Sequence, residues 1–376
     1  YMRGQKSDYD YWASQGNRGW SWDDVLPIFR RSEDYQHGAD DFHGSGGELR
    51  VEERRVNWEI LDVWREAAAQ TGIPKIKEFN TGDNFGNAYF QMNQRSGKRW
   101  SAARAFLDTA QKRPNLTVMT ESMVQKLALQ HTDKGLVATG VHVLHKGQAQ
   151  LITVNKEVLL AAGAVASPQI LQLSGIGAPE LLQQHGIEAK RELPGVGNNL
   201  QDHLQIRTIY SVDNTVTLNR RAKYPWGMAK MGLEYLFNKT GPMTMPPSQL
   251  GAFAKSDPSQ ASANIEWHVQ PLSLDAFGSP LHKYDAITPS VCNLRPSSRG
   301  SISITSTDPA TAPAIRPNYL STEEDLNIAV AGLKFTRKIM AAPALQPFNP
   351  KELKPGAHLT SEDELASAAG DLGTTI

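Results

Sequence analysis

The stretch Gly163 to Gly177, GAVASPQILQLSGIG, follows the apolar run Glu157 to Ala162, EVLLAA, and together they decide the fold class. The apolar run has the composition of a buried strand. We expect Ser167 to accept hydrogen bonds from the first free helix amides, Pro168 to occupy the first helical position and Gly175 to end the helix in the left-handed conformation. The small residues at the turn let a backbone approach a bulky ligand closely. The pattern therefore predicts a strand, turn and helix suited to a nucleotide cofactor, within an α/β architecture.

Before this crossover the sequence favours first a helix and then a set of strands. Residues 58–70 place apolar side chains on one helical face, with Asn57 as the expected cap. From Leu116 to Ala162 the composition favours strands, at 116–119, 137–144 and 152–154, which predicts an antiparallel meander.

Past residue 204 the pattern favours a separate, mostly antiparallel sheet flanked by helices. We expect longer strands at 205–212, 265–269 and 301–306, joined by connections rich in Pro and Gly. Capping boxes from Ser321 to Glu324 and from Ser361 to Glu364 predict two helix starts. The chain is thus expected to form two domains, residues 1–204 and 205–376.

Composition excludes several classes of function. The chain has 376 residues, an apolar share of 40%, and 39 basic against 39 acidic residues, so nucleic acid is not expected as a partner. No apolar run is long enough for a transmembrane helix. The single cysteine, Cys292, excludes an intrachain disulfide framework. We expect a cytoplasmic or membrane-peripheral protein.

Hydrolase and metal chemistry are not supported either. No G-x-S-x-G nucleophile elbow occurs. His142 and His145 are three apart in an expected strand and lack acidic or cysteine partners at useful spacing, so no metal site is predicted. Asp202 and His203 are adjacent on an extended segment and point to opposite faces, which favours a structural role. His43 is expected to stabilise a loop.

The crossover and several further segments resemble the glucose-methanol-choline (GMC) flavin oxidoreductases. The run ending in Ser174-Gly175-Ile176-Gly177 is similar to the second signature of that family. Other similar segments follow in the family's order: Arg3-Gly4, Phe42-His43-Gly44, Ser101 to Leu107, Pro194 to Gly197 with Asn199-Leu200 and Asp202-His203, and Leu294-Arg295-Pro296. The resemblance covers essentially the whole chain. It implies an FAD-binding domain over 1–204, a substrate-binding domain over 205–376, and oxidation of an alcohol by hydride transfer to the flavin N5 atom.

Two elements of that family are expected but not found in the sequence. A G-x-G-x-x-G turn that holds the FAD pyrophosphate does not occur. The resemblance places the catalytic histidine, and its His or Asn partner, beyond Ile376, so no catalytic residue is assigned within the chain. We expect the sequence to be an internal fragment, inactive as it stands and lacking stoichiometric flavin.

The resemblance also implies cofactor contacts within the chain. Val124 corresponds to a strand residue whose backbone N–H and C=O groups contact the FAD adenine. Ala162 and Gly163 correspond to backbone positions close to the cofactor. For each of the three the alternative interpretation is a simple packing role.

The substrate pocket is expected to include Gln249, Glu266 and Trp267. Gln249 is neutral at the position where a choline-acting relative would be expected to carry an acid, which makes choline a doubtful substrate. Glu266 is an alternative acid beside Trp267, although only one face of that strand can point inward. An aliphatic or aromatic alcohol accommodated by Trp226, Phe237, Phe253 and Trp267 fits at least as well, unless these aromatic residues are core.

Two other functions stay open at this point. Some proteins of this fold keep the flavin and act as lyases on cyanohydrins. The chain could also be a non-enzymatic truncated product. The electron acceptor, oxygen or another carrier, is not readable from the sequence.

Overall fold

The computed structural model describes residues 1–133, 135–276 and 278–375. The described chain forms two compact units. Unit 1 comprises Tyr1–Arg113, His203–Arg295 and Leu326–Ile376, and unit 2 comprises Pro114–Asp202 and Pro296–Asp325. One boundary lies close to the predicted division at 204, but the first 113 residues belong to the same unit as the second sheet.

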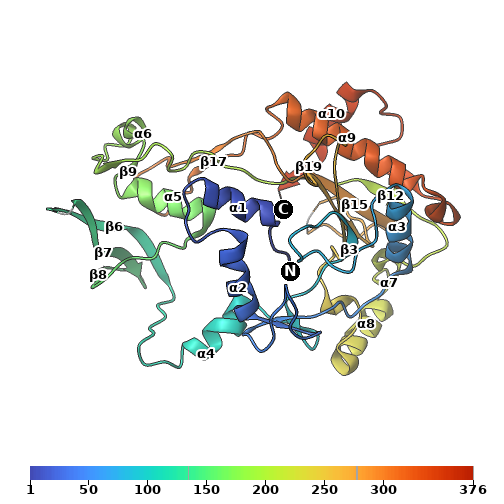
Figure 1. Cartoon of the computed structure of the whole chain (residues 1–376), viewed down its shortest axis with the longest axis horizontal. Helices are drawn as coiled ribbons and strands as arrows, with labels where there is room; N and C mark the ends of the chain where they lie inside the picture. Colours follow the sequence, from blue (N-terminus) through green and yellow to red (C-terminus); the bar gives the residue numbers. More distant parts are fainter. Residues whose placement is uncertain (134, 277, 376) are drawn as a thin grey trace. The chain divides into compact units, whose positions relative to one another are not determined.

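Unit 1 is built on an eight-stranded sheet, which confirms the predicted antiparallel sheet (Figure 1). Its strands are β3 (Gly86–Tyr89), β11 (Leu204–Ile206), β12 (Ile209–Ser211), β13 (Leu250–Ala254), β14 (Ile265–Gln270), β15 (Ala286–Asn293), β18 (Lys351–Lys354) and β19 (Gly373–Thr375). The order is β18-β12-β15-β14-β13-β3, with β11 pairing both β15 and β19. All described pairs in this sheet are antiparallel. Because β3 pairs with β13, the amino-terminal segment is joined to unit 1.

Unit 1 also contains helices and helical turns. They are α1 (Lys6–Ser14), α2 (Trp22–Ser32), α3 (Glu59–Gln70), α4 (Asp108–Ala110) after the π-helical turn η1 (Ala103–Leu107), α7 (Leu218–Arg221), α8 (Pro225–Asn238), most of α9 (Glu323–Met340), α10 (Glu362–Leu372), and the 3₁₀ turns η2 (Pro242–Thr244) and η3 (Pro343–Phe348). Two short pairs, β1 (Glu33–Tyr35) with β2 (Leu49–Val51) and β4 (Gln94–Arg95) with β5 (Lys98–Arg99), complete the unit.

Three predicted helix starts can be compared with the structure. α3 is confirmed, but its N-cap is Trp58 rather than Asn57, and no side chain caps it. The capping box at Ser361 is confirmed, since its hydroxyl accepts from the Glu364 amide. The box at Ser321 is wrong: Thr322 Oγ1 accepts from the Asp325 amide at 3.2 Å, so the cap lies one residue later.

Unit 2 contains the predicted antiparallel meander. Its strands β6 (Ser122–Thr132), β7 (Gly135–His145) and β8 (Gln148–Thr153) pair in sequence order. The other elements are α5 (Gly163–Leu173), α6 (Pro179–Gln184), the parallel pair β9 (Ile176–Gly177) and β10 (Arg191–Glu192), and the antiparallel pair β16 (Ser301–Ser303) and β17 (Ala314–Arg316).

The crossover that opened the sequence analysis differs from expectation at its start. Residues 157–162 form no strand and are largely exposed, Leu159 by 82%, because no described strand pairs with them. α5 begins at Gly163 rather than after Ser167, so Pro168 lies inside the helix. Ser167 Oγ accepts from the Ala162 amide, outside the helix. Gly175 is left-handed (φ +84°) as predicted.

Three further strand predictions need correction. Residues 116–119 are irregular, and residues 205–212 split into β11 and β12. The strand expected at 301–306 is limited to β16 and pairs with β17 in unit 2 rather than with the large sheet. Among the described residues no helix combines the length and the apolar character needed to cross a bilayer.

Candidate functional site

A cavity of about 480 Å³ lies within unit 1, where the amino-terminal segment meets the large sheet. Aromatic rings and charged groups form its wall together. The lining residues are Met2, Arg3, Gly4, Gln5, Asp8, Tyr9, Trp12, Asn84, His203, Phe253, Glu266, Leu294 and Arg295. Three of these, Phe253, Glu266 and Leu294, come from β13, β14 and the residue after β15, so the sheet fixes their relative positions.

Glu266 and Arg3 are the buried charges of this cavity, and Arg3 is paired with Glu33 at 2.9 Å. The Glu266 side chain stays on the cavity face of β14, and the residue is only 7% exposed. One carboxylate oxygen lies 2.7 Å from His268 Nε2, two residues along the same face. Burial tends to lower the pKa of His268, but the hydrogen bond and negative charge of Glu266 outweigh it and raise that pKa above its usual value.

Strand register brings two more reactive side chains to Glu266. Glu266 is directly opposite Cys292 on β15, and the ligand atoms of His203, Glu266 and Cys292 all lie within 4.8 Å of one another. No local sequence pattern links these three residues, because they come together only when the strands pair. His203 Nε2 also lies 3.2 Å from the Leu294 carbonyl oxygen. Burial and the charge of Glu266 raise the pKa of the Cys292 thiol.

The structure separates the three predicted substrate residues. Glu266 lines the cavity, whereas Trp267 points to the other side of β14, where its indole Nε1 donates to Thr336 Oγ1 at 2.7 Å. Trp267 is fully buried, so its predicted pocket role is replaced by a core role. Gln249 is also buried, just before β13, and is not part of the cavity wall.

Of the other aromatic residues considered for the pocket, only one lines the cavity. Phe253 does so, and its ring also packs against Phe79. Trp226 and Phe237 lie on α8 with most of their surface exposed to solvent. Neither residue lines this cavity.

The predicted cofactor contacts lie in unit 2. Val124 is in β6, an edge strand of the meander, so half of the backbone groups of β6 face away from β7. Gly163 opens α5 at a left-handed φ of +82°, and no atom lies within 4 Å of the place a Cβ would take. Ala162, its N-cap, is exposed. This open, small-residue helix start fits a nucleotide that approaches the backbone.

A cavity of about 460 Å³ runs beside the first turns of α5. It is lined by Ala164, Ser167, Pro168, Leu171, Val196, Gly197, Asn198, Asn199, Leu200, Gln201 and Ile302. The segment 196–201 was singled out in the sequence as a family-like landmark, and the structure brings it beside the crossover. The two similar segments therefore form one wall.

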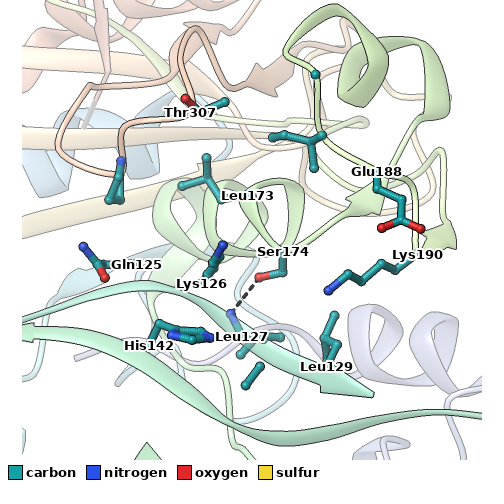
Figure 2. A pocket seen from close by; sticks show the side chains of 14 residues that line it. Gln125, Lys126, Leu127, Leu129, His142, Leu173, Ser174, Glu188, Lys190 and Thr307 are labelled. Atoms are coloured by element: carbon teal, nitrogen blue, oxygen red, sulfur yellow. Dashed lines mark hydrogen bonds between the residues drawn. The ribbon is translucent and has the colours of Figure 1, made fainter. Parts of the chain in front are cut away.

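A third cavity, of about 600 Å³, lies between β6 and the end of α5 (Figure 2). Figure 2 shows Ser174 pointing to β6, where its Oγ accepts from the Leu127 amide at 2.8 Å. The same hydroxyl donates to the Ile170 carbonyl at 2.5 Å. These bonds hold the end of α5 on β6, and so fix Val124 and Gly163 relative to one another.

His43, His145 and Asp202 have structural partners, whereas His142 and His203 line cavities. His43 is buried, and its Nδ1 lies 3.0 Å from Glu33 and its Nε2 3.3 Å from Glu78. Asp202 accepts a hydrogen bond from the Tyr319 hydroxyl, while His203 lines the cavity of unit 1. His145 bonds Ser122 Oγ, and His142 lines the cavity of Figure 2.

Comparison with known proteins places these features in one family. Two GMC oxidoreductase family models match residues 1–205 and 296–375. Human mitochondrial choline dehydrogenase is 37% identical over 365 residues, which are 97% of this chain and 61% of the human protein. The chain thus spans less than two thirds of that relative.

Solved structures agree with this assignment. Pyridoxine 4-oxidase from Mesorbium loti has a TM-score of 0.84 at 28% identity, covering 100% of this chain and 69% of that one. An FAD-dependent oxidoreductase from Chaetomium thermophilum has a TM-score of 0.88 at 25% identity, covering 100% of this chain and 72% of that one. With family models matching more than half of its residues, the chain belongs to the GMC oxidoreductase family.

Proposed function

We propose that this chain serves an FAD-dependent oxidoreductase that acts on the CH–OH group of an alcohol carrying a cationic group, with choline as the first candidate. The buried carboxylate of Glu266 in an aromatic-lined cavity carries the proposal. The relatives support it, because the human one is named choline dehydrogenase. The neutral Gln249 no longer argues against a cation, since Glu266 supplies the acid.

Different residues of the cavity supply the negative charge and the aromatic contacts that would bind the cation. A quaternary ammonium cannot donate a hydrogen bond, so it is attracted by charge and by aromatic faces. Glu266 provides the charge, and Tyr9, Trp12 and Phe253 line the same cavity. Their rings also exclude water, which strengthens the attraction to the carboxylate. The Asp8 carboxylate is paired with Arg295 at 2.8 Å, whereas Glu266 shares its charge with His268, so Glu266 selects the substrate when that ring is neutral.

Unit 2 supplies the cofactor side. Val124 on the edge strand β6, with Ala162 and Gly163 at the start of α5, would hold FAD through the backbone. FAD supplies the hydride acceptor for alcohol oxidation when it is bound. Ser174 keeps α5 attached to β6, so that these contacts are oriented before the cofactor arrives. No residue of the chain is assigned as the base that removes the hydroxyl proton.

The test is anaerobic mixing of choline, or of its neutral isostere 3,3-dimethylbutan-1-ol, with an FAD-loaded protein that joins this chain to the segments by which its relatives are longer. We expect choline to bleach the flavin absorbance and the isostere to do so far less efficiently. The Glu266→Gln variant should lose this preference. Equal rates for both alcohols would contradict the cation site, and release of an aldehyde and cyanide from a cyanohydrin without flavin reduction would instead support the lyase alternative.

A further inference from the structure

Helix α8 (Pro225–Asn238) presents its apolar side to solvent. Trp226 and Phe237 are 69% and 76% exposed, and Leu233 and Leu236 are exposed as well. At about 100° per residue, these four side chains and Ala229 lie on one side of the helix. Only Met231 of α8 is buried. A surface helix normally turns such a stripe towards the core, so α8 is oriented the opposite way.

The exposed stripe continues beyond the helix. Tyr224, the N-cap, stacks on Trp226 with ring centroids 4.5 Å apart, and Met243 is exposed on η2, which packs against α8. In Figure 1, α8 (yellow) lies at the edge of unit 1, next to α7. We define the α8 apolar face as Tyr224, Trp226, Leu233, Leu236, Phe237 and Met243. A contiguous apolar face of this kind marks an interaction surface.

Basic residues surround this face although the whole chain carries no net charge. Residues 218–239 contain one acid, Glu234, and five basic residues, Arg220, Arg221, Lys223, Lys230 and Lys239. Lys223 and Lys239 lie over the rings of Tyr224 and Tyr235, at 5.4 and 4.5 Å. Glu234 is half-buried and accepts from Thr240 Oγ1, so it adds little negative charge to the outer side. Arg220 is paired with Asp285, and Arg221 lies over the buried Trp58 ring at 4.4 Å, so the basic charge beside the face comes mainly from Lys223, Lys230 and Lys239.

This combination fits one partner best. Tryptophan, tyrosine and leucine on one face with a lysine and arginine rim are the composition of a helix that lies in the interface of a membrane. A second copy of the chain would bring another basic face against this one, and like charges repel. We propose that the α8 apolar face docks on an anionic lipid surface, with the basic residues among the headgroups. The inference does not depend on the proposed alcohol oxidation.

Vesicle co-sedimentation of the whole chain tests the proposal. We expect binding to vesicles of phosphatidylcholine with phosphatidylglycerol, weaker binding to phosphatidylcholine alone, and loss of binding as salt rises. A variant carrying Trp226→Gln, Leu233→Gln and Phe237→Gln should bind at least about tenfold more weakly. The matched control is Ile28→Gln on α2, which removes an exposed apolar side chain outside the patch and should bind as the wild type does.

A second measurement does not rely on the triple variant. Bromine-labelled lipids should quench tryptophan fluorescence of the wild-type chain, and Trp226→Phe, which keeps the face apolar, should lose most of that quenching. Absence of vesicle binding, or equal binding by the triple variant, would overturn the proposal. So would a wild-type dimer in light scattering that the triple variant converts to monomer, because the face would then be an interface between two copies.

Discussion

At the residue scale, the alternation of side chains along β14 explains which of its residues line the cavity. A period of two requires Glu266 and Trp267 to face opposite sides, and the structure places one in the cavity and the other against Thr336. That much could be predicted from sequence. The meeting of Glu266 with Cys292 and His203 could not, because it depends on the register between β14 and β15 and on where β11 begins.

Replacing Glu266 by glutamine should weaken the binding of choline while preserving the fold. The substitution removes a buried charge and keeps its shape, so we expect a loss of about 2 kcal/mol, roughly 30-fold in Kd. Titration calorimetry with choline measures it, and 3,3-dimethylbutan-1-ol serves as the neutral control ligand. An unchanged Kd for choline would mean that the cation does not reach this carboxylate.

The affinity for choline should also depend on pH through His268. At low pH the protonated ring neutralises Glu266, and its pKa is raised above the usual value, so the competing charge persists into the neutral range. As pH rises through that pKa the ring loses its proton, Glu266 becomes available, and choline should bind more tightly. His268→Gln should flatten this profile. His203→Gln tests the other imidazole of the cavity and should keep it.

At the element scale, the glycine that ends α5 was correctly predicted, whereas the start of the helix was not. A left-handed residue is required wherever the chain reverses at a helix end, and Gly175 is the residue there that adopts it at little cost. The start was misplaced because Ser167 and Pro168 have the composition of a helix start, while the preceding Gly163 to Ala166 also continue the helix. The strand expected at 157–162 needs a partner strand, which local sequence cannot reveal.

Replacing Gly175 by alanine should destabilise unit 2. A Cβ there would lie 2.4 Å from the Glu188 carbonyl oxygen, in a backbone conformation that alanine resists. We expect a loss on the order of 3 kcal/mol in the free energy of unfolding, measured by urea denaturation. Gly186→Ala is the matched control, since Gly186 is also left-handed but has nothing within 4 Å of the added atom. Its cost should be about 1 kcal/mol. Equal costs would show that the contact with Glu188 relaxes freely.

At the scale of the whole molecule, the chain divides differently from a single boundary at 204. The first 113 residues join unit 1 because β3 pairs with β13, and a buried charge cluster within the segment holds its own parts together. In that cluster Arg3 lies 2.9 Å from Glu33, and Glu33 also contacts His43. Contacts between residues so far apart in the sequence cannot be predicted from local sequence patterns. The antiparallel meander and the large antiparallel sheet could nevertheless be predicted, whereas the four two-stranded sheets of the described residues, two of them parallel, could not.

This cluster predicts how the stability of the chain varies with pH. Burial tends to lower the pKa of His43, but hydrogen bonds and charges from Glu33 and Glu78 outweigh it and raise the pKa to about 9. The stabilisation is therefore fully present below the unfolded pKa of about 6.5 and is lost as pH rises through about 9. We expect a decrease on the order of 2–3 kcal/mol over that range.

Thermal unfolding monitored by circular dichroism between pH 6 and pH 10 measures this decrease. His43→Gln should be less stable at pH 6 and should show a smaller slope with pH. If His43→Gln keeps the full pH dependence of the wild-type stability, the loss of stability at alkaline pH comes from another group.

The thiol of Cys292 can report when the large sheet of unit 1 opens. It is the only thiol, it is buried in the central strand β15, and its raised pKa keeps it protonated. A thiol-specific reagent therefore has a single target, which reacts only when β15 separates from its neighbours. The rate of labelling therefore measures how often the large sheet opens, without any engineered probe. A cation bound against Glu266 should lower that rate.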